Sequence, residues 1–359
     1  MSPTKKKVLI AMSGGVDSSV AAALLQQQGF ACSGAFFITW TQPLKGLTMC
    51  PWEKDVYDAR RVCDVLGIDL YTFNFEREYE QRVVDYFFRE YQAGHTPNPD
   101  VLCNREIKFN LFLDQAKKLG YDYIATGHYA QIKKTTPGHY ALHKGIDPDK
   151  DQSYFLYALN QQQLAASLFP VGGLKKTEVR KLAKKFKLPN ADKKDSQGIC
   201  FLGQIKLKDF LQSRIAIRAG KIVDPSGKQL GTHDGTSFYT IGQRRGLGIG
   251  GAGEPYYVVS KDEKTNTLVV DRESSEELSA TKLLAVEPTW IDRQPILPLT
   301  GAAKIRYRQP DQAATITAAA DGKLLVTFTA PQKAISPGQS VVFYRDTNVL
   351  GGAIISHRL

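Results

Sequence analysis

The stretch Ala11-Met-Ser-Gly-Gly-Val-Asp-Ser18 decides the expected fold of the first part of the chain. It follows the apolar residues 8–11, which are typical of a buried strand, and precedes a run with helical spacing over residues 18–28. Glycine lets the backbone approach an oxyanion closely, and the free N–H groups at a helix start favour phosphate. The stretch lacks the Gly-Lys-Ser/Thr of a Walker A loop. We therefore expect a different kind of anion-binding turn between a first strand and a first helix.

The same residues resemble the pyrophosphate loop, Ser-Gly-Gly-x-Asp-Ser, of enzymes that split ATP into AMP and pyrophosphate. The resemblance implies activation of a substrate by adenylation rather than phosphoryl transfer. The alternative is an ordinary strand–helix turn that contains glycine, and the match of the whole pattern in the right context disfavours it.

Up to about residue 130 the chain alternates between strand-like and helix-like patterns. Strands are expected at 31–38, 70–73 and 123–126, and helices at 53–66, 77–93 and 108–119. This alternation predicts an α/β fold with a doubly wound parallel sheet, in which ligands bind beyond the carboxyl ends of the strands.

From about residue 220 the pattern changes to short β-like runs separated by turn residues. Beyond residue 283 strands are expected at 303–307, 314–318, 324–329, 340–344 and 351–355. Short strands in such number are typical of a small closed barrel. We expect three domains: a catalytic domain over 1–215, a small central β-rich domain over 216–282 and a C-terminal β-barrel over 283–359.

The composition is strongly basic. The 359 residues include 47 Lys and Arg against 36 Asp and Glu, a net charge of +11. Basic residues often come in pairs, such as Lys175-Lys176 and Arg244-Arg245. A nucleic-acid partner would explain this balance, whereas the alternative is a surface that is merely rich in lysine. No apolar run approaches the ~20 residues that span a bilayer, so we expect a cytoplasmic protein with no membrane partner.

The five cysteines include no Cys-x-x-Cys pair. This argues against a disulfide framework or a zinc site, so we expect no metal site built from cysteines, and any disulfide to be catalytic.

Cys103 follows the loop Gly94-His-Thr-Pro-Asn-Pro-Asp100, which two prolines hold extended. A helix is expected to start at Asn104, and a cysteine at a helix N-terminus beside Arg105 should have a pKa below ~8.5. Asp100 is a candidate proton acceptor. The alternative is a packing cysteine after a structural turn, but a thiol on a proline-stiffened loop favours the reactive interpretation.

Cys200 ends the stretch Asp195-Ser-Gln-Gly-Ile-Cys200. Lys193 and Lys194 precede it and would favour a thiolate electrostatically. On this pattern alone, the structural and the reactive interpretations are about equally good.

Motifs along the whole chain together resemble the tRNA-specific 2-thiouridylase family. Beside residues 11–18 they are Thr96-Pro-Asn-Pro-Asp-Val-Leu-Cys103-Asn, Lys108-Phe109, Ala125-Thr-Gly-His-Tyr129, Lys150-Asp-Gln-Ser-Tyr-Phe155, Asp195-Ser-Gln-Gly-Ile-Cys200-Phe and Tyr239-Thr-Ile-Gly-Gln-Arg244. The resemblance implies ATP-dependent 2-thiolation of the wobble uridine, position 34, of tRNA. It implies adenylation of the C2 oxygen, transfer of persulfide sulfur, and release of AMP and pyrophosphate.

The resemblance also implies ATP and Mg²⁺ as cofactors, with Asp17 helping to hold the metal. It implies tRNA and a persulfide sulfur-donor protein, a desulfurase or a relay carrier, as partners. Cys200 resembles the cysteine that receives persulfide sulfur, and Cys103 the nucleophile that joins it in a transient disulfide, with Asp100 nearby. Two routes stay open: direct attack by the persulfide on C2, or local release of hydrosulfide by Cys103.

Further residues are assigned by the same resemblance. The target base would be contacted by Asn98, Pro99 and Asp100. The nucleotide would be contacted by Ala11, Met12, Ser13, Gly14, Gly15, Val16, Asp17, Ser18, Phe37 and Gly127. The tRNA would be contacted by Lys150, Asp151, Gln152, Arg306 and Tyr307, and the C-terminal barrel would carry the last two.

Further expectations concern Phe37, the pair Arg306 and Arg308, and His128. Phe37 stands where family members often have a methionine, and an aromatic ring can pack on adenine in its place. Strand alternation would put Arg306 and Arg308 on one face, which suits phosphate binding. His128 is expected to line the nucleotide pocket rather than to act as a general base.

Two rival functions remain. One is an amide-forming ATP pyrophosphatase that adenylates a small molecule, which would leave Cys103, Cys200 and the β domains without a purpose. The other is a non-catalytic RNA-binding module with a relic nucleotide site, which a tRNA-dependent exchange of ATP and pyrophosphate would exclude.

Overall fold

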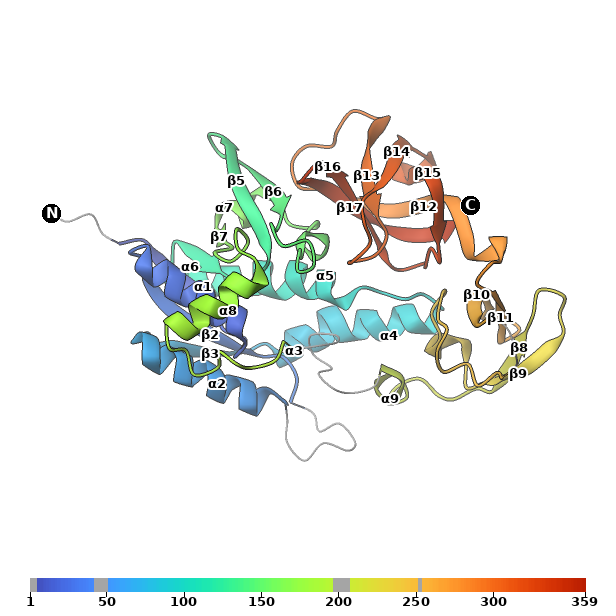
Figure 1. Cartoon of the computed structure of the whole chain (residues 1–359), viewed down its shortest axis with the longest axis horizontal. Helices are drawn as coiled ribbons and strands as arrows, with labels where there is room; N and C mark the ends of the chain where they lie inside the picture. Colours follow the sequence, from blue (N-terminus) through green and yellow to red (C-terminus); the bar gives the residue numbers. More distant parts are fainter. Residues whose placement is uncertain (1–4, 42–50, 196–206, 251–253) are drawn as a thin grey trace.

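The computed structural model describes residues 5–41, 51–195, 207–250 and 254–359. The strands of these residues form three sheets (Figure 1). Among the described residues, no helix has the length and apolar character needed to cross a membrane.

The first sheet is parallel throughout and has the order β3-β2-β1-β4-β7. Its strands are β1 (Lys7–Ala11), β2 (Ala31–Ile38), β3 (Leu70–Asn74), β4 (Tyr123–Ala125) and β7 (Ser167–Leu168). The order reverses around β1, so the predicted doubly wound sheet is confirmed. The turn at residues 11–18 lies at the carboxyl end of the central strand.

Helices cover both faces of this sheet. On one face the buried side chains come from α1 (Val16–Gln27), α2 (Pro51–Leu66) and α8 (Lys176–Lys185). The other face is covered by two helical rods, α3-η1-α4 and α5-η2-α6. Their segments are α3 (Glu76–Tyr79), η1 (Glu80–Val84), α4 (Asp85–Gln92), α5 (Pro99–Cys103), η2 (Asn104–Leu111) and α6 (Phe112–Lys118), with η1 and η2 wound as π-helix.

The second rod begins earlier than predicted. The expected starts at 104 and 108 are wrong, because the helix already begins at Pro99. Asn98 is its N-cap and its side-chain oxygen accepts a hydrogen bond from Val101 N at 3.4 Å. Proline suits the first helical position because its missing N–H would have no partner there. Cys103 therefore lies more than one turn inside a continuous helical rod.

A hairpin connects the first part of the chain to the last. It consists of β5 (Ala130–Thr136) and β6 (His139–Lys144) and has no counterpart among the predicted elements. β6 pairs with the last strand, β17 (Asn348–Arg358), through His143 opposite Asn348 and Leu142 opposite Val349. The hairpin thus extends a sheet of the C-terminal region, although it follows β4 in the chain.

The small central region holds a four-stranded sheet of order β10-β11-β8-β9. Its strands are β8 (Gly220–Val223), β9 (Gln229–His233), β10 (Tyr256–Asp262) and β11 (Thr267–Arg272). Ile222, Val258 and Leu268 are buried and connect this sheet to the larger core cluster. The first helical rod extends toward this region from the parallel sheet (Figure 1).

The C-terminal region forms the predicted barrel. Its strands run in the order β12-β15-β14-β13-β16-β17, and an additional pairing of β12 with β17 closes the ring. They are β12 (Ser279–Trp290), β13 (Leu299–Lys304), β14 (Gln312–Ala318), β15 (Leu324–Lys333), β16 (Ser340–Arg345) and β17. The interior is apolar and includes Leu283, Ile316, Val326 and Phe343.

The strand expected at 303–307 is wrong at its end. β13 stops at Lys304 and Arg306 lies in the turn that follows, where the backbone N–H of Ile305 donates to the side chain of Gln309 at 2.8 Å. The alternating-face argument for Arg306 and Arg308 therefore does not apply.

Candidate functional site at the carboxyl ends of β1 and β4

The turn after β1 needs glycine at Gly14. This residue has φ +69°, and a Cβ there would collide with the carbonyl oxygen of Asp55. Gly15 is the N-cap of α1, and Ser18 and Ser19 both donate to its carbonyl, at 3.1 and 2.8 Å. The Ser13 backbone N–H donates to the Ser18 hydroxyl at 3.2 Å. The turn is thus tightly folded at a helix N-terminus, where backbone N–H groups favour anions.

Gly127, after β4, packs directly on this turn. A Cβ at Gly127 would lie 2.6 Å from Ser18 N and 2.7 Å from the Asp17 carbonyl carbon. The two adjacent strand ends therefore meet backbone to backbone. Any larger residue at position 127 would push the turn away.

Asp17 is held by two side chains from other elements. Lys176 Nζ lies 2.7 and 2.8 Å from its two carboxylate oxygens, and the Tyr129 hydroxyl donates to it at 2.7 Å. Burial, and then the neighbouring Asp17 carboxylate, raises the pKa of Tyr129 above its ordinary value, so this phenol stays protonated. Lys176 is a site residue that the sequence pattern marks only as half of a basic pair, because nothing local relates residue 176 to residue 17.

Asp195 is the centre of a second cluster of charges. It accepts from Lys150 at 2.7 Å, Lys176 at 2.8 Å and Arg180 at 2.6 Å. Partial burial alone would raise the pKa of Asp195, but the hydrogen bonds from Lys150 and Lys176 outweigh it and lower that pKa to about 2. Lys176 therefore contacts both Asp17, in the turn after β1, and Asp195.

Lys193 also contacts the turn after β1. Its Nζ lies 2.7 Å from Asp55 and 2.6 Å from Asp58, and 3.2 Å from the Gly14 carbonyl oxygen. Asn190 supports the same carbonyl at 2.9 Å. The expected electrostatic effect of Lys193 and Lys194 on a thiolate at Cys200 stays a prediction. Cys200 itself lies outside the described residues.

Phe37 is part of an aromatic cluster. It stands near the end of β2, with its ring centroid 4.6 Å from that of Phe112 and 5.5 Å from that of Phe75. Its neighbour Phe36 is buried with the α1 face of the sheet. Packing on adenine stays a prediction for Phe37.

His128 is buried and neutral. Its Nδ1 lies 2.7 Å from the Thr126 hydroxyl, and its ring packs against Phe109 and Phe169, which also contact each other. Burial, with a further contribution from the charge of Lys108, lowers the pKa of His128 well below its ordinary value. An uncharged imidazole in this position suits the predicted pocket-lining role.

Cys103 is buried, with 4% of its surface exposed. It belongs to the same core cluster as Val101, Leu102 and Ile107. The Arg105 guanidinium, expected to lower the pKa of Cys103, donates instead to Glu106 at 2.9 Å. The helix already begins at Pro99, so Cys103 does not stand at its N-terminus. The reactivity expected of this thiol stays a prediction.

The residues predicted to contact tRNA come from two domains, and two of them meet. The Tyr307 hydroxyl lies 3.4 Å from the Lys150 carbonyl oxygen, and its ring packs on Phe155. Asp151 is buried and accepts from the N–H groups of Gly145 and Ser153. Gln152 accepts from Tyr129 N at 3.0 Å, and Arg306 Nη2 donates to the Ala334 carbonyl at 2.9 Å. Asp151 and Gln152 thus accept backbone hydrogen bonds and stabilise the conformation of the loop after β6. Lys150 and Arg306 are the two cations among the predicted tRNA contacts.

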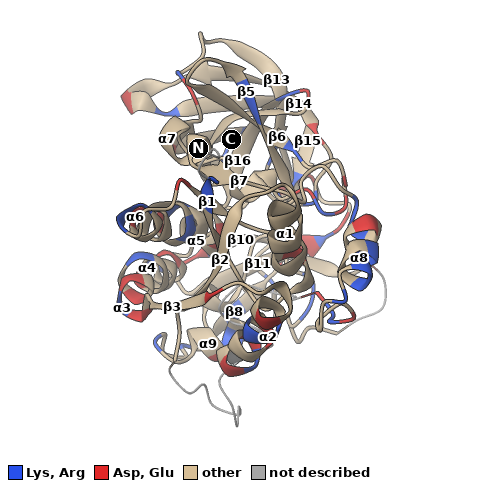
Figure 2. Cartoon of the chain, turned by 90° about the vertical axis from the view of Figure 1, so that its left-hand side faces the viewer, with Lys and Arg blue, Asp and Glu red and all other residues tan. Residues whose placement is uncertain are grey.

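Basic residues are spread over several elements. Figure 2 shows them on α6, α8 and the hairpin β5–β6, with acidic residues among them on α8. Lys117, Lys118, Lys184 and Lys185 occupy the last turns of α6 and α8. They complement the negative ends of the helix dipoles, so part of the positive charge has a local structural reason.

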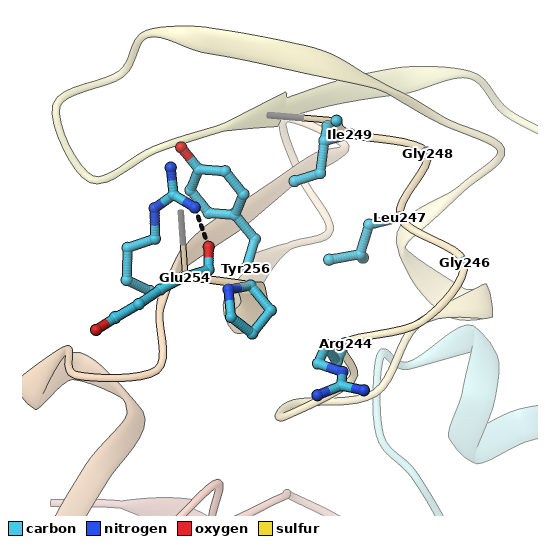
Figure 3. Close-up of a pocket in the computed structure, with 10 residues that line it drawn as sticks. Arg244, Gly246, Leu247, Gly248, Ile249, Glu254 and Tyr256 are labelled. Atoms are coloured by element: carbon cyan, nitrogen blue, oxygen red, sulfur yellow. Dashed lines mark hydrogen bonds between the residues drawn. The ribbon is translucent and has the colours of Figure 1, made fainter. Parts of the chain in front are cut away.

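A separate hollow of about 360 Å³ lies in the central region (Figure 3). Arg244, Leu247, Ile249 and Tyr256 line it, and none of the predicted site residues does. The Arg272 guanidinium lies 3.8 Å from the centroid of the Tyr256 ring and donates to the Glu254 carbonyl. This arginine is therefore already engaged inside the domain.

The turn of residues 11–18 offers one carboxylate, that of Asp17, to a magnesium ion. Among the described residues, no group of three or more His, Cys, Asp and Glu side chains could hold a metal on its own. Mg²⁺ is commonly held by one or two carboxylates together with substrate phosphates and water. Asp17 is the carboxylate available for that mode, and a magnesium ion there would have to take the place of Lys176 on one of its two oxygens.

The parallel sheet with this turn defines a nucleotide-binding α/β protein, and comparison with known proteins agrees. Residues 6–204 match the family model of the tRNA methyl transferase HUP domain. Residues 208–272 match the tRNA methyl transferase PRC-barrel domain, and 280–355 the aminomethyltransferase β-barrel domain.

Full-length relatives narrow the class to one family. A tRNA-specific 2-thiouridylase of Alkaliphilus oremlandii (strain OhILAs) is 50% identical, with 99% of each chain covered. One from Klebsiella pneumoniae (strain 342) is 48% identical over 100% of this chain and 99% of its own. One from Protochlamydia amoebophila (strain UWE25) is 47% identical over 98% and 93%. The chain belongs to the tRNA-specific 2-thiouridylase family, whose members are tRNA sulfurtransferases.

Proposed function

We propose that this chain uses ATP to replace O2 of the wobble uridine, position 34, of tRNA by sulfur. The observation that carries the proposal is the full-length similarity to 2-thiouridylases at 50% identity. The tight turn of residues 11–18, with Gly127 packed on it, supports the ATP half of the reaction. Cys103 and Cys200 supply the two thiols that the sulfur half needs.

The first step is adenylation. The C2 oxygen of uridine attacks the α-phosphorus of ATP and pyrophosphate leaves, which turns a poor leaving group into AMP. Residues 11–18 would hold the pyrophosphate through backbone N–H groups and the hydroxyls of Ser13 and Ser18. Asp17 would hold Mg²⁺, which neutralises phosphate charge when bound. Lys176, 2.7 Å from Asp17, would supply positive charge beside that position.

The second step delivers sulfur from a persulfide on Cys200, loaded by a sulfur-donor protein. In one route the terminal sulfur attacks C2 and AMP leaves; the Cys103 thiolate then attacks Cys200 Sγ and breaks the S–S bond. In the other route Cys103 attacks Cys200 Sγ first and releases hydrosulfide, which attacks C2 and displaces AMP. Both routes end in a Cys103–Cys200 disulfide that an external dithiol reduces. Asp100 is the proposed proton acceptor for the Cys103 thiol.

The target base must leave its stack to reach a buried thiol, as other base-modifying enzymes require. Asn98, Pro99 and Asp100 are proposed to contact it, since they form the first turn of the rod that carries Cys103. Lys150, Asp151, Gln152, Arg306 and Tyr307 are proposed to contact the rest of the tRNA, with Lys150 and Arg306 supplying charge for phosphates. The proposed domain limits stay at 1–215, 216–282 and 283–359.

The experiment that tests the proposal uses Cys103→Ser in the full-length protein. With ATP, tRNA and a persulfide donor, this variant should gain one sulfur atom on the peptide containing Cys200 and form no internal disulfide. Thiolated uridine in the tRNA should fall below detection by mass spectrometry. Cys32→Ser, in strand β2, is the matched control and should thiolate tRNA at the parent rate. A Cys103→Ser protein that thiolates tRNA normally would remove Cys103 from the mechanism.

A further inference from the structure

Residues 94–98 connect the two helical rods and lead into the rod that carries Cys103. We call them the approach segment. Pro97 and Pro99 flank Asn98 and fix two backbone torsions, so little slack separates the segment from α5. Whatever holds the approach segment also sets where α5 begins, and hence where Cys103 and the proposed base contacts lie.

The C-terminal barrel holds the approach segment from one side. The backbone N–H of Thr96 donates to the Pro337 carbonyl at 2.8 Å. Gln339 Nε2 donates to the carbonyl oxygens of Thr96, at 2.8 Å, and Pro97, at 3.2 Å. One glutamine of the barrel thus satisfies two backbone acceptors of the approach segment.

The fit between these two chain segments is close. Gly338 has φ +87°, and a Cβ there would lie 2.9 Å from His95 Cβ and 3.0 Å from Thr96 N. Glycine is required at this position both by the backbone conformation and by the contact. The turn of the barrel and the approach segment therefore touch backbone to backbone.

The central domain holds the approach segment from the other side. The Thr96 hydroxyl donates to the Thr240 hydroxyl at 3.1 Å. Gly94, with φ +78°, leaves room for Glu263, whose Oε1 would lie 2.5 Å from a Cβ at that position. The barrel and the central domain also meet each other here, because the Ser336 hydroxyl donates to the Ile241 carbonyl at 3.2 Å. All three domains therefore meet at the approach segment.

We propose that Gln339 is a positioning residue for the thiolation reaction: it fixes the approach segment and, through it, the helical rod that carries Cys103. It acts through Thr96 and Pro97 and needs no contact with the reacting atoms. Because the barrel carries proposed tRNA contacts, tRNA bound to the barrel would affect the position of the Cys103 thiol through these hydrogen bonds. The inference rests on the proposed role of Cys103.

The test compares Gln339→Met with Gln332→Met in the full-length protein. Both changes keep the side-chain volume and remove a side-chain amide from the barrel. Among the described residues, the Gln332 amide bonds only within the barrel, to Gln309, Gln312 and Ala330. A general loss of barrel stability should therefore appear in both variants, while a loss of positioning should appear only in Gln339→Met.

Two readouts are measured. In thiolation assays, Gln339→Met should lower kcat about tenfold and leave KM for tRNA within about twofold, since misplacing a catalytic group affects the chemical step. In the folded protein without substrates, iodoacetamide should modify Cys103 about tenfold faster than in Gln332→Met, because the rod loses its anchor and opens more often. Mass spectrometry of the Cys103 peptide gives this rate.

Unchanged kcat and unchanged Cys103 labelling in Gln339→Met would overturn the proposal. A higher KM for tRNA with normal kcat and labelling would also overturn it, because Gln339 would then be a tRNA contact only. If the parent protein itself fails to thiolate tRNA, the proposed function is wrong. The labelling rates then still decide whether Gln339 anchors the rod: equal rates in both variants contradict it, and a faster rate in Gln339→Met supports it.

Discussion

The nucleotide end of the parallel sheet and the helical rod that carries Cys103 are built in different ways. The nucleotide end comes from one domain, where the turn after β1 packs on Gly127 and is held by Lys176, Asn190 and Lys193. The start of the rod is fixed by residues of all three domains. In the proposed function ATP would therefore bind to a prebuilt turn, whereas the placement of the Cys103 thiol would depend on how the domains sit together.

The largest effect is expected from a substitution at Asp17, which tests whether the nucleotide end acts separately from tRNA binding. Asp17→Asn keeps the shape of the side chain but removes the charge proposed to hold Mg²⁺. It should slow tRNA-dependent exchange of ATP and pyrophosphate by ~100-fold or more, since it removes a transition-state charge contact. The dissociation constant for tRNA, measured by filter binding, should change less than about twofold. Asp64→Asn, on the exposed side of α2, is the control. Equal losses of exchange and tRNA affinity would contradict the separation.

A smaller effect is expected from crowding the turn. Gly127→Ala forces a methyl group to within 2.6 Å of Ser18 N, and overpacking of this kind costs ~1–3 kcal/mol. ATP affinity, measured by calorimetry, should fall by ~10-fold. Gly173→Ala meets nothing within 4 Å and serves as the matched control. If both variants bind ATP as the parent does, the turn is less rigid than its close packing implies.

The barrel side of the comparison is tested at Arg306. Arg306→Glu should weaken binding of every tRNA substrate. For each phosphate that the side chain neutralises in the parent protein, the slope of log Kd against log salt concentration should decrease by ~0.7–0.9. ATP binding should not change, because Arg306 lies in another domain. Arg293→Glu, in an exposed loop of the same barrel, controls for net charge. A changed choice of tRNA with an unchanged slope would mean that Arg306 contacts bases.

The smallest effect concerns the stability of the nucleotide end. The pKa of His128 is lowered in the folded state, so below pH ~6.5 the unfolded chain binds a proton that the folded chain does not. Stability should therefore fall as the pH drops, by up to ~1.4 kcal/mol between pH ~7.5 and ~5.5 from this group. Urea unfolding of His128→Gln should show that much less pH dependence than the parent. The exposed His357→Gln should behave like the parent.

The features that could be predicted from the sequence are those that residues close together in the chain specify. The alternation of strands and helices, the glycine turn and the closed barrel were all predictable because period, turn chemistry and length agree locally. The early helix start at Pro99 also had a local signal, since Asn followed by Pro is typical of an N-cap and first helical position. The hairpin at 130–144 had one as well, in Pro137-Gly138 between two polar, β-like runs.

Other features had no local signal. Lys176 reaches Asp17 across 159 positions, and Gln339 reaches Thr96 across 243. Spacing and periodicity say nothing about such pairs, because only the packing of whole domains brings them together. Arg306 was misplaced for a different, local reason: the side chain of Gln309, four residues after Ile305, accepts the Ile305 N–H, and the strand ends there.

The pairing of β6 with β17 has a consequence for how the chain is made. His143 meets Thr347, which is synthesised 204 residues later. At ~5–20 residues per second, the ribosome takes roughly 10–40 s to supply that partner. During this interval the nascent chain carries β6 as an open edge, to which another chain could add. Lysines at positions 133, 134 and 144 lie along this hairpin and repel a second copy of it. Expression of the first 215 residues alone would make the open edge permanent.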